Sequence, residues 1–170
     1  MNPAPRPTSQ KASRRSAARL AAVQALYQSE LTAAPVAEIV DEFVAHRLGR
    51  EIEGIAFVEA DPEFFADLVL GAVERQGEID GLITGALAEG WPLERLDSTL
   101  RAMLRAGTYE LLARPDVPAR VVITEYVDIA HAFFEGLEPG FVNGVLDRLG
   151  HILRPGKLEG NDGERPARAG

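Results

Sequence analysis

The sequence contains no cysteine, and this absence excludes several kinds of chemistry. Disulfides, thiolate metal ligands and cysteine nucleophiles all require a thiol. The longest apolar runs, such as FFADLVLGAV, are far shorter than the roughly 20 residues that a membrane-spanning helix needs. The basic N-terminus is not followed by an apolar segment with a cleavage site, as a secretory signal would be. We therefore expect a cytoplasmic protein without a membrane segment.

Motifs of catalytic and cofactor sites are also missing. The sequence has no phosphate-binding glycine loop, no dinucleotide-binding fingerprint and no nucleophile elbow. The three histidines, His46, His131 and His151, lie in separate segments without a second histidine four residues away, which disfavours a metal site. Pairs of acidic residues are common in a chain with 26 of them and indicate solvated surfaces. We expect no enzyme active site, no cofactor and no metal.

Positive charge, in contrast, is concentrated at one end of an acidic chain. The formal net charge is -8, yet residues 1–29 contain five basic residues and no acidic one. The remaining residues include 13 basic and 26 acidic ones. A basic segment on an acidic body is typical of a polyanion site of limited extent. A solvated basic tail is the alternative, and charge alone does not separate the two.

Apolar residues recur at helical spacing along most of the chain. In residues 14–31, Leu20, Val23, Leu26 and Leu31 form one predicted stripe that would hold this helix to the core. The longest predicted helix begins with an Asp-Pro cap at residue 61 and ends at residue 87, with a bend near Gly77 or Gly81. Further helical patterns cover residues 36–49, 98–114, 116–134 and 140–153.

No segment shows the two-residue alternation of a half-buried strand. The segment VVIT, at residues 121–124, resembles a strand in isolation, but its surroundings have helical spacing. The sequence therefore predicts an all-α fold, a bundle of about six or seven helices within residues 14–153. A flexible basic arm is expected at residues 1–13 and a disordered tail, rich in glycine, proline and charge, at residues 154–170.

Three blocks of the sequence resemble the NusB family of transcription antitermination factors. They are RRSAARLAAVQALYQSEL near the start, LERLDSTLRAMLRAGTYELLARPDVPARVVITEYVDIAHAF in the middle and FVNGVLDRL near the end. With the segments between them, they span about residues 14–150. The resemblance implies an all-helical fold in two helical subdomains, a basic N-terminal helix that binds boxA RNA, and a heterodimer with NusE, a ribosomal protein of the small subunit.

The resemblance also assigns RNA-binding residues. Arg14, Arg15 and Arg19 match the arginine-rich start of the first helix of the family, and helix N-termini and arginine both favour phosphate. Tyr27 matches an aromatic residue near the same surface, and Arg105 matches an arginine that supports it. The alternatives are a tyrosine at the edge of the core and an ordinary surface arginine.

Five other residues are assigned by the resemblance to the surface that binds the protein partner. Phe133 and Phe141 would serve as aromatic anchors, although both could instead belong to the core. Leu137 occupies a place where relatives can carry an acid. Glu74 and Glu78 of the long predicted helix would face a basic ribosomal protein.

The implied function is binding without chemistry. The chain and NusE together would bind boxA in the leader of rRNA transcripts, and the pair would join an RNA polymerase elongation complex with other Nus factors that resists termination. One alternative is a stand-alone relative of the N-terminal domain of rRNA cytosine methyltransferases, because a chain that stops at Gly170 leaves no room for their catalytic domain. Another is a helical domain that binds only proteins. We expect a monomer in preference to a homodimer.

Overall fold

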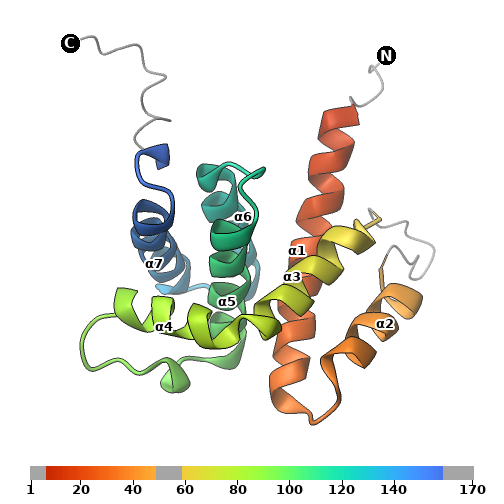
Figure 1. The fold of residues 1–170 in the computed structure, drawn as a ribbon, viewed down its shortest axis with the longest axis horizontal. Helices are drawn as coiled ribbons and strands as arrows, with labels where there is room; N and C mark the ends of the chain where they lie inside the picture. Colours follow the sequence, from red (N-terminus) through yellow and green to blue (C-terminus); the bar gives the residue numbers. More distant parts are fainter. Residues whose placement is uncertain (1–6, 49–58, 159–170) are drawn as a thin grey trace. The chain divides into compact units, whose positions relative to one another are not determined.

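The computed structural model of the chain describes residues 7–48 and 59–158, with side chains from residue 11 onward. Within these ranges there are seven α-helices, one 3-10 turn and no strand, which confirms the predicted all-α fold (Figure 1). In chain order the elements are α1 (Pro7–Leu31), α2 (Val36–His46), α3 (Pro62–Glu74), α4 (Gln76–Ala86), η1 (Leu93–Arg95), α5 (Ser98–Ala113), α6 (Ala119–Phe133) and α7 (Glu138–Leu153).

The helices form two compact units, as the family resemblance implies. The first unit, residues 1–74, contains α1, α2 and α3. The second unit, residues 75–170, contains α4 to α7 with η1. Each unit has its own hydrophobic interior.

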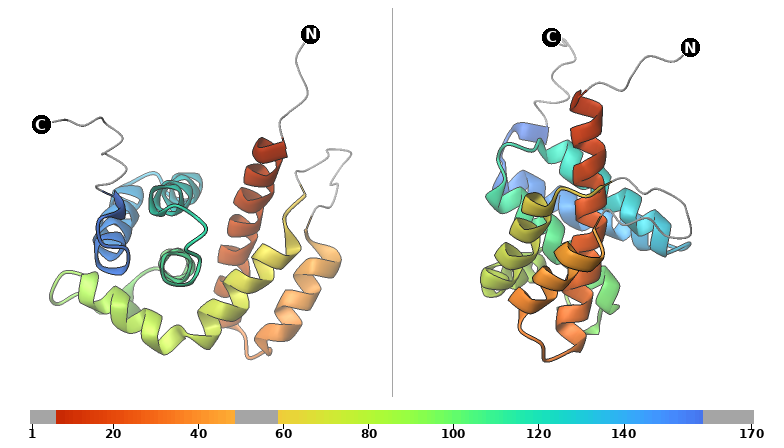
Figure 2. Two further views of the ribbon diagram at one scale, coloured as in Figure 1. Left: turned by 45° about the horizontal axis from the view of Figure 1, so that its top comes forward. Right: turned by 90° about the vertical axis from the view of Figure 1, so that its right-hand side faces the viewer.

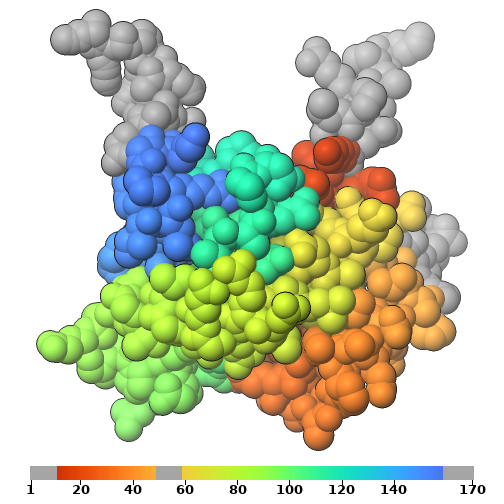
Figure 3. Space-filling model, in the orientation of Figure 1, coloured from red at the N-terminus to blue at the C-terminus, as the bar shows by residue number. Residues whose placement is uncertain are grey.

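In the first unit, α3 packs against both α1 and α2. The rings of Phe43 in α2 and Phe65 in α3 are stacked with their centroids 5.5 Å apart, and the surfaces of these two helices adjoin in Figure 3. Helix α1 contributes mainly small buried residues: Ala18, Ala21, Ala22, Val23, Ala25 and Leu26. Leu20 and Leu31 were expected in this stripe but are exposed.

In the second unit, α5 contacts α4, α6 and α7 (Figure 2). Gly107 in α5 permits this close packing, because a Cβ atom there would lie only 3.0 Å from a methyl group of Leu146 in α7. The helix predicted over residues 116–134 is confirmed as α6, which spans the shorter range Ala119–Phe133, with Tyr126 fully buried. The hydroxyl of Tyr126 donates a hydrogen bond of 2.9 Å to the carboxylate of Glu110, which is also fully buried.

The long helix predicted over residues 61–87 is in fact two helices. The backbone of Arg75, with φ -103° and ψ 21°, leaves the helical region between α3 and α4. The break therefore precedes Gly77 and Gly81, where the sequence placed a bend. It falls where the first compact unit ends, so α3 and α4 bury their apolar faces in different units.

At both ends of the chain, ordered structure extends further than the sequence predicts. Helix α1 starts at Pro7, a residue type suited to the first helical position, so residues 7–13 of the expected flexible arm are helical. At the other end, Arg154 donates hydrogen bonds to backbone carbonyls and Leu158 is buried. The expected disordered tail is therefore ordered as far as residue 158. Residues 1–6 and 159–170 of these two predictions lie outside the described residues.

Candidate nucleic-acid interface

The three predicted RNA-binding arginines of α1 differ sharply in exposure. Arg14 is exposed, Arg15 is half-buried, and only 3% of Arg19 is exposed. Arg19 lies one turn beyond Arg15 and on the same helical face as Ala22, Val23 and Leu26, which pack into the first unit. The expectation that all three arginines are exposed to phosphate is therefore wrong for Arg19.

The position of these arginines within α1 also differs from the prediction. Because α1 begins at Pro7, residues 14–19 lie in its second to fourth turns and not at its first turn. The unpaired N–H groups of a helix belong to its first four residues. Any affinity of Arg14 and Arg15 for phosphate must therefore come from their guanidinium groups. Lys11, one turn before Arg15, adds a further exposed cation.

Phe64, in the first turn of α3, lies beneath two of the arginines. The guanidinium carbon of Arg15 is 4.4 Å from the centroid of the Phe64 ring, and that of Arg19 is 5.0 Å away. These are cation–π distances. Sequence reasoning did not single out Phe64, although it recognised the helix start that positions it. The available signal was a pair of adjacent phenylalanines, which point about 100° apart on a helix and so cannot both face α2.

A capping residue fixes Phe64 relative to α1. Asp61 accepts hydrogen bonds through Oδ1 from the N–H groups of Glu63, at 3.1 Å, and Phe64, at 3.0 Å. The N–H of Asp61 donates to the carbonyl oxygen of Arg14 at 3.1 Å. The start of α3 is thus tied directly to the turn of α1 that carries Arg14 and Arg15.

Tyr27 and Arg105 have different surroundings. Tyr27, on α1, is 39% exposed and so can be reached from solvent. Arg105, on α5 in the second unit, forms a bidentate ion pair with Asp80 on α4, with Nε to Oδ1 at 2.8 Å and an Nη to Oδ2 at 2.9 Å. Its side chain is 14% exposed. The ion pair joins α4 to α5, and nothing in the sequence pattern marked Asp80 as the partner.

The predicted protein-binding residues include an exposed apolar set in the second unit. Phe133, the last residue of α6, is 43% exposed, and Leu137, directly before α7, is 89% exposed. Phe141, in the first turn of α7, is half-buried. The expected alternative, that Phe133 belongs to the core, is therefore wrong.

The two predicted acidic contacts lie in different helices. Glu74 ends α3 and is exposed. Glu78, in the first turn of α4, is exposed and forms an ion pair of 2.9 Å with Arg75. The sequence placed them one turn apart on a single helix, whereas the break at Arg75 assigns them to separate compact units.

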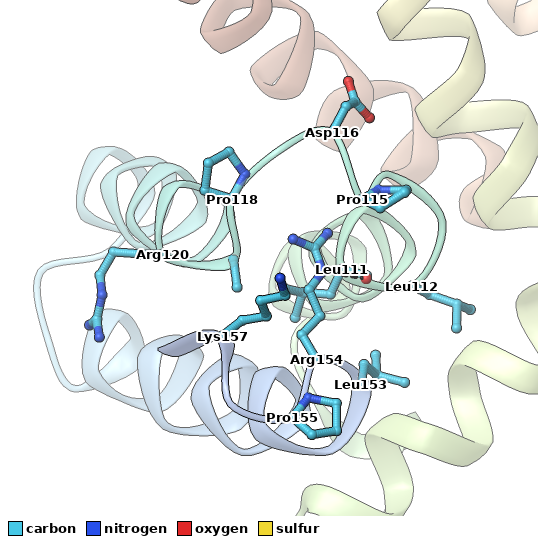
Figure 4. Close-up of a pocket in the computed structure, with 11 residues that line it drawn as sticks. Leu111, Leu112, Pro115, Asp116, Pro118, Arg120, Leu153, Arg154, Pro155 and Lys157 are labelled. Carbon is cyan, nitrogen blue, oxygen red and sulfur yellow. Dashed lines mark hydrogen bonds between the residues drawn. The ribbon is translucent and has the colours of Figure 1, made fainter. Parts of the chain in front are cut away.

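A cavity of about 600 Å³ in the second unit lies among the end of α5, the start of α6 and the segment after α7 (Figure 4). The guanidinium of Arg154 lies at its centre and donates to the carbonyl oxygens of Glu110, Leu111, Arg114 and Val117. Burial lowers the pKa of Arg154, while Glu110 and Asp116 raise it. This arginine ties the segment after α7 to the end of α5 and to the segment between α5 and α6, which is a structural role.

Within residues 7–48 and 59–158 no three histidine, aspartate or glutamate side chains are grouped as a metal site requires. None of the helices in these ranges is both long enough and apolar enough to cross a membrane.

Comparison with known proteins places this chain in one family. The sequence profile of the NusB family matches residues 16–151. The transcription antitermination protein NusB of Sphingopyxis alaskensis is 57% identical over 144 residues, which cover 85% of this chain and 97% of that protein. The NusB protein of Agrobacterium fabrum is 54% identical over 148 residues, which cover 87% of this chain and 90% of that protein.

Solved structures agree with this assignment. The NusB structure of T. maritima is 32% identical with a TM-score of 0.69, and the match covers 85% of this chain and 96% of that one. A crystal structure of the antitermination factors NusB and NusE in complex with double-stranded RNA contains a chain that is 28% identical with a TM-score of 0.67, matched over 82% of this chain and 97% of that one. The chain described here therefore belongs to the NusB family of transcription antitermination proteins.

Proposed function

We propose that this chain binds boxA-type RNA of rRNA leader transcripts together with NusE, and that the pair helps the elongating RNA polymerase to resist termination. The NusB family consists of RNA-binding antitermination factors and not of enzymes. The observation that carries the proposal is the match along most of the chain to a NusB chain that was crystallised with both NusE and RNA.

The first unit supplies the proposed RNA-binding residues Arg14, Arg15 and Tyr27. The two arginines offer bidentate contacts to phosphate, and the exposed ring of Tyr27 offers a stacking surface for an unpaired base. Arg19 is buried beside Phe64 and supports this surface from within. Arg105, in the second unit, is a further proposed RNA-binding residue, and its ion pair with Asp80 holds its side chain in place.

The second unit supplies the proposed anchors for NusE. Phe133, Leu137 and Phe141 form an apolar set at the junction of α6 and α7, and exposed apolar patches with a polar rim are typical of interaction sites. Glu78 in the same unit, and Glu74 at the end of the first unit, would attract a basic ribosomal protein and raise its rate of association. Assembly with the polymerase and other Nus factors would follow in the cytoplasm, with the free chain a monomer.

The direct test is a titration of labelled boxA RNA with this protein, with and without NusE. We expect NusE to increase the affinity, because each protein offers only part of the contact surface. A scrambled RNA of equal length and composition is the control for sequence preference. Equal affinity for the two RNAs, together with no effect of NusE, would overturn the proposal.

A second test addresses the arginines themselves. Arg14→Ala combined with Arg15→Ala should weaken RNA binding and reduce the slope of log affinity against log salt by about 0.7 to 1.4, since each phosphate contact to a single strand contributes roughly 0.7 to that slope. Arg95→Ala, which removes one exposed cation from the second unit, is the control for a general change of charge. A slope that does not change in the double variant would show that α1 is not the site.

A further inference from the structure

We infer that Phe64 is a positioning residue for RNA binding: its ring holds the Arg15 guanidinium in the orientation that binds phosphate, with Arg19 packed against the same ring as an inner support. This inference rests on the proposed function. No feature of the NusB resemblance assigned a role to Phe64.

The geometry argues against a purely apolar role for this ring. Phe64 is almost completely buried, and two guanidinium groups, at 4.4 Å and 5.0 Å from its centroid, form part of what covers it. Burying a guanidinium group, wholly as in Arg19 or partly as in Arg15, costs free energy unless other groups compensate for its lost hydration. The negative face of an aromatic ring provides part of that compensation, and an aliphatic residue of similar size would not.

The neighbouring phenylalanine shows the contrast. Phe65 is also buried in α3, but its ring stacks on Phe43 of α2 and so belongs to the apolar interior. Two adjacent residues of identical type therefore have different surroundings: one ring faces other apolar groups and the other faces the cations of α1.

Fixing Arg15 matters because an unrestrained arginine has many rotamers. Fixing such a side chain when RNA binds costs conformational entropy. A side chain that is already held in place in the free protein avoids most of this cost. The side chain of Asp61 accepts a hydrogen bond from the N–H of Phe64, and the N–H of Asp61 donates one to the carbonyl oxygen of Arg14. These two bonds fix the position of Phe64 relative to the turn that carries Arg14 and Arg15. Arg15 is half-buried and therefore both restrained on one side and accessible on the other. Arg15 and Arg19 each make at least one further interaction. Loss of the ring should therefore increase the mobility of their side chains without removing every contact that holds them.

The experiment compares Phe64→Leu with Phe65→Leu in the full chain with NusE present. Both variants remove a buried ring from the same helix and should lower the stability of the first unit. Only Phe64→Leu should weaken boxA RNA binding, by about threefold to tenfold, the range expected for loss of a partly desolvated cation–π contact. It should also make the salt dependence shallower by up to about one unit of slope. Phe64→Tyr, which keeps an aromatic face, should retain most of the affinity.

A double-variant cycle completes the test. In a chain that already carries Arg15→Ala, adding Phe64→Leu should have much less effect on RNA affinity than it has alone, since the group to be positioned is absent. If Phe64→Leu binds RNA like Phe65→Leu while Arg15→Ala weakens binding, the inference is wrong and the proposed function stands. If the arginine variants also leave RNA binding unchanged, the proposed function itself fails. If the leucine variants do not fold, full affinity of Arg15→Ala would by itself overturn the inference.

Discussion

The ion pair between Arg105 and Asp80 should contribute measurably to the stability of the second unit. It is bidentate, with both N–O distances below 3 Å, and its side chains are only 14% and 28% exposed. Exposed ion pairs are typically worth less than about 1 kcal/mol, whereas hydrogen bonds to charged groups in drier surroundings are worth about 1.5–3 kcal/mol. For a partly exposed pair we expect a coupling free energy of about 1–2 kcal/mol.

The measurement is a double-mutant cycle with Arg105→Met and Asp80→Asn, followed by urea unfolding. The pair of Arg75 and Glu78 in the same unit is the matched control, because it has the same chemistry but side chains that are 39% and 50% exposed. Its coupling should be about 0.3–0.5 kcal/mol, the usual range for an exposed pair on a helix. A coupling for Arg105 and Asp80 no larger than that of the control would refute the reasoning.

The same variants distinguish two roles of Arg105 in RNA binding. If the ion pair with Asp80 holds Arg105 in the orientation that RNA binding requires, both single variants should weaken boxA binding to a similar extent. If the arginine instead contacts RNA directly, Arg105→Met alone should weaken binding, and Asp80→Asn should leave it unchanged or strengthen it by removing a competing anion.

Three further predictions concern the interior of the second unit, all measured by urea unfolding. Arg154→Met should cost about 2–4 kcal/mol, because four backbone carbonyls, at the end of α5 and in the segment between α5 and α6, lose a charged donor. Lys157→Met, at an exposed position nearby, should cost almost nothing, and equal values would contradict this. Tyr126→Phe should cost about 1–2 kcal/mol, because it removes a donor from buried Glu110, and a neutral result would mean that other groups fully solvate that carboxylate. Gly107→Ala should cost about 1–3 kcal/mol by overpacking, unless the facing leucine can move without strain.

The fold was predictable because it depends on periodic features. Helical spacing placed nearly every helix, and the capping residues Asp61 and Pro62 indicated the start of α3 to the residue. The sequence did not predict the features that depend on which of the two compact units a helix belongs to. The break at Arg75 has no glycine or proline to mark it, and it exists because α3 and α4 bury their apolar faces in different units.

The tail shows a second limit of the sequence. Residues 154–158 are polar or small except for Leu158, and such composition is typical of disorder. They are ordered because Arg154 donates to carbonyls of α5 and of the segment between α5 and α6, and because Leu158 covers Gly150, where there is no Cβ to exclude it. Both contacts link residues that are distant in the sequence or depend on a missing side chain, so neither has a local signal.

The face of α1 that packs into the first unit determines which of its arginines remain available to RNA. The stripe drawn through Leu20 and Leu31 weighted the largest apolar residues of α1, but the helix buries its alanines, which allow α3 to approach closely. Traced back from Leu26 by steps of three and four, the buried face passes through Ala22 to Arg19 and then reaches Arg15 at its edge. Three arginines that look equivalent in the sequence are therefore an exposed, a half-buried and a buried residue. The positive charge that α1 can offer to RNA is set by where this face meets Phe64, so the substitution of that one uncharged residue should alter the salt dependence of RNA binding.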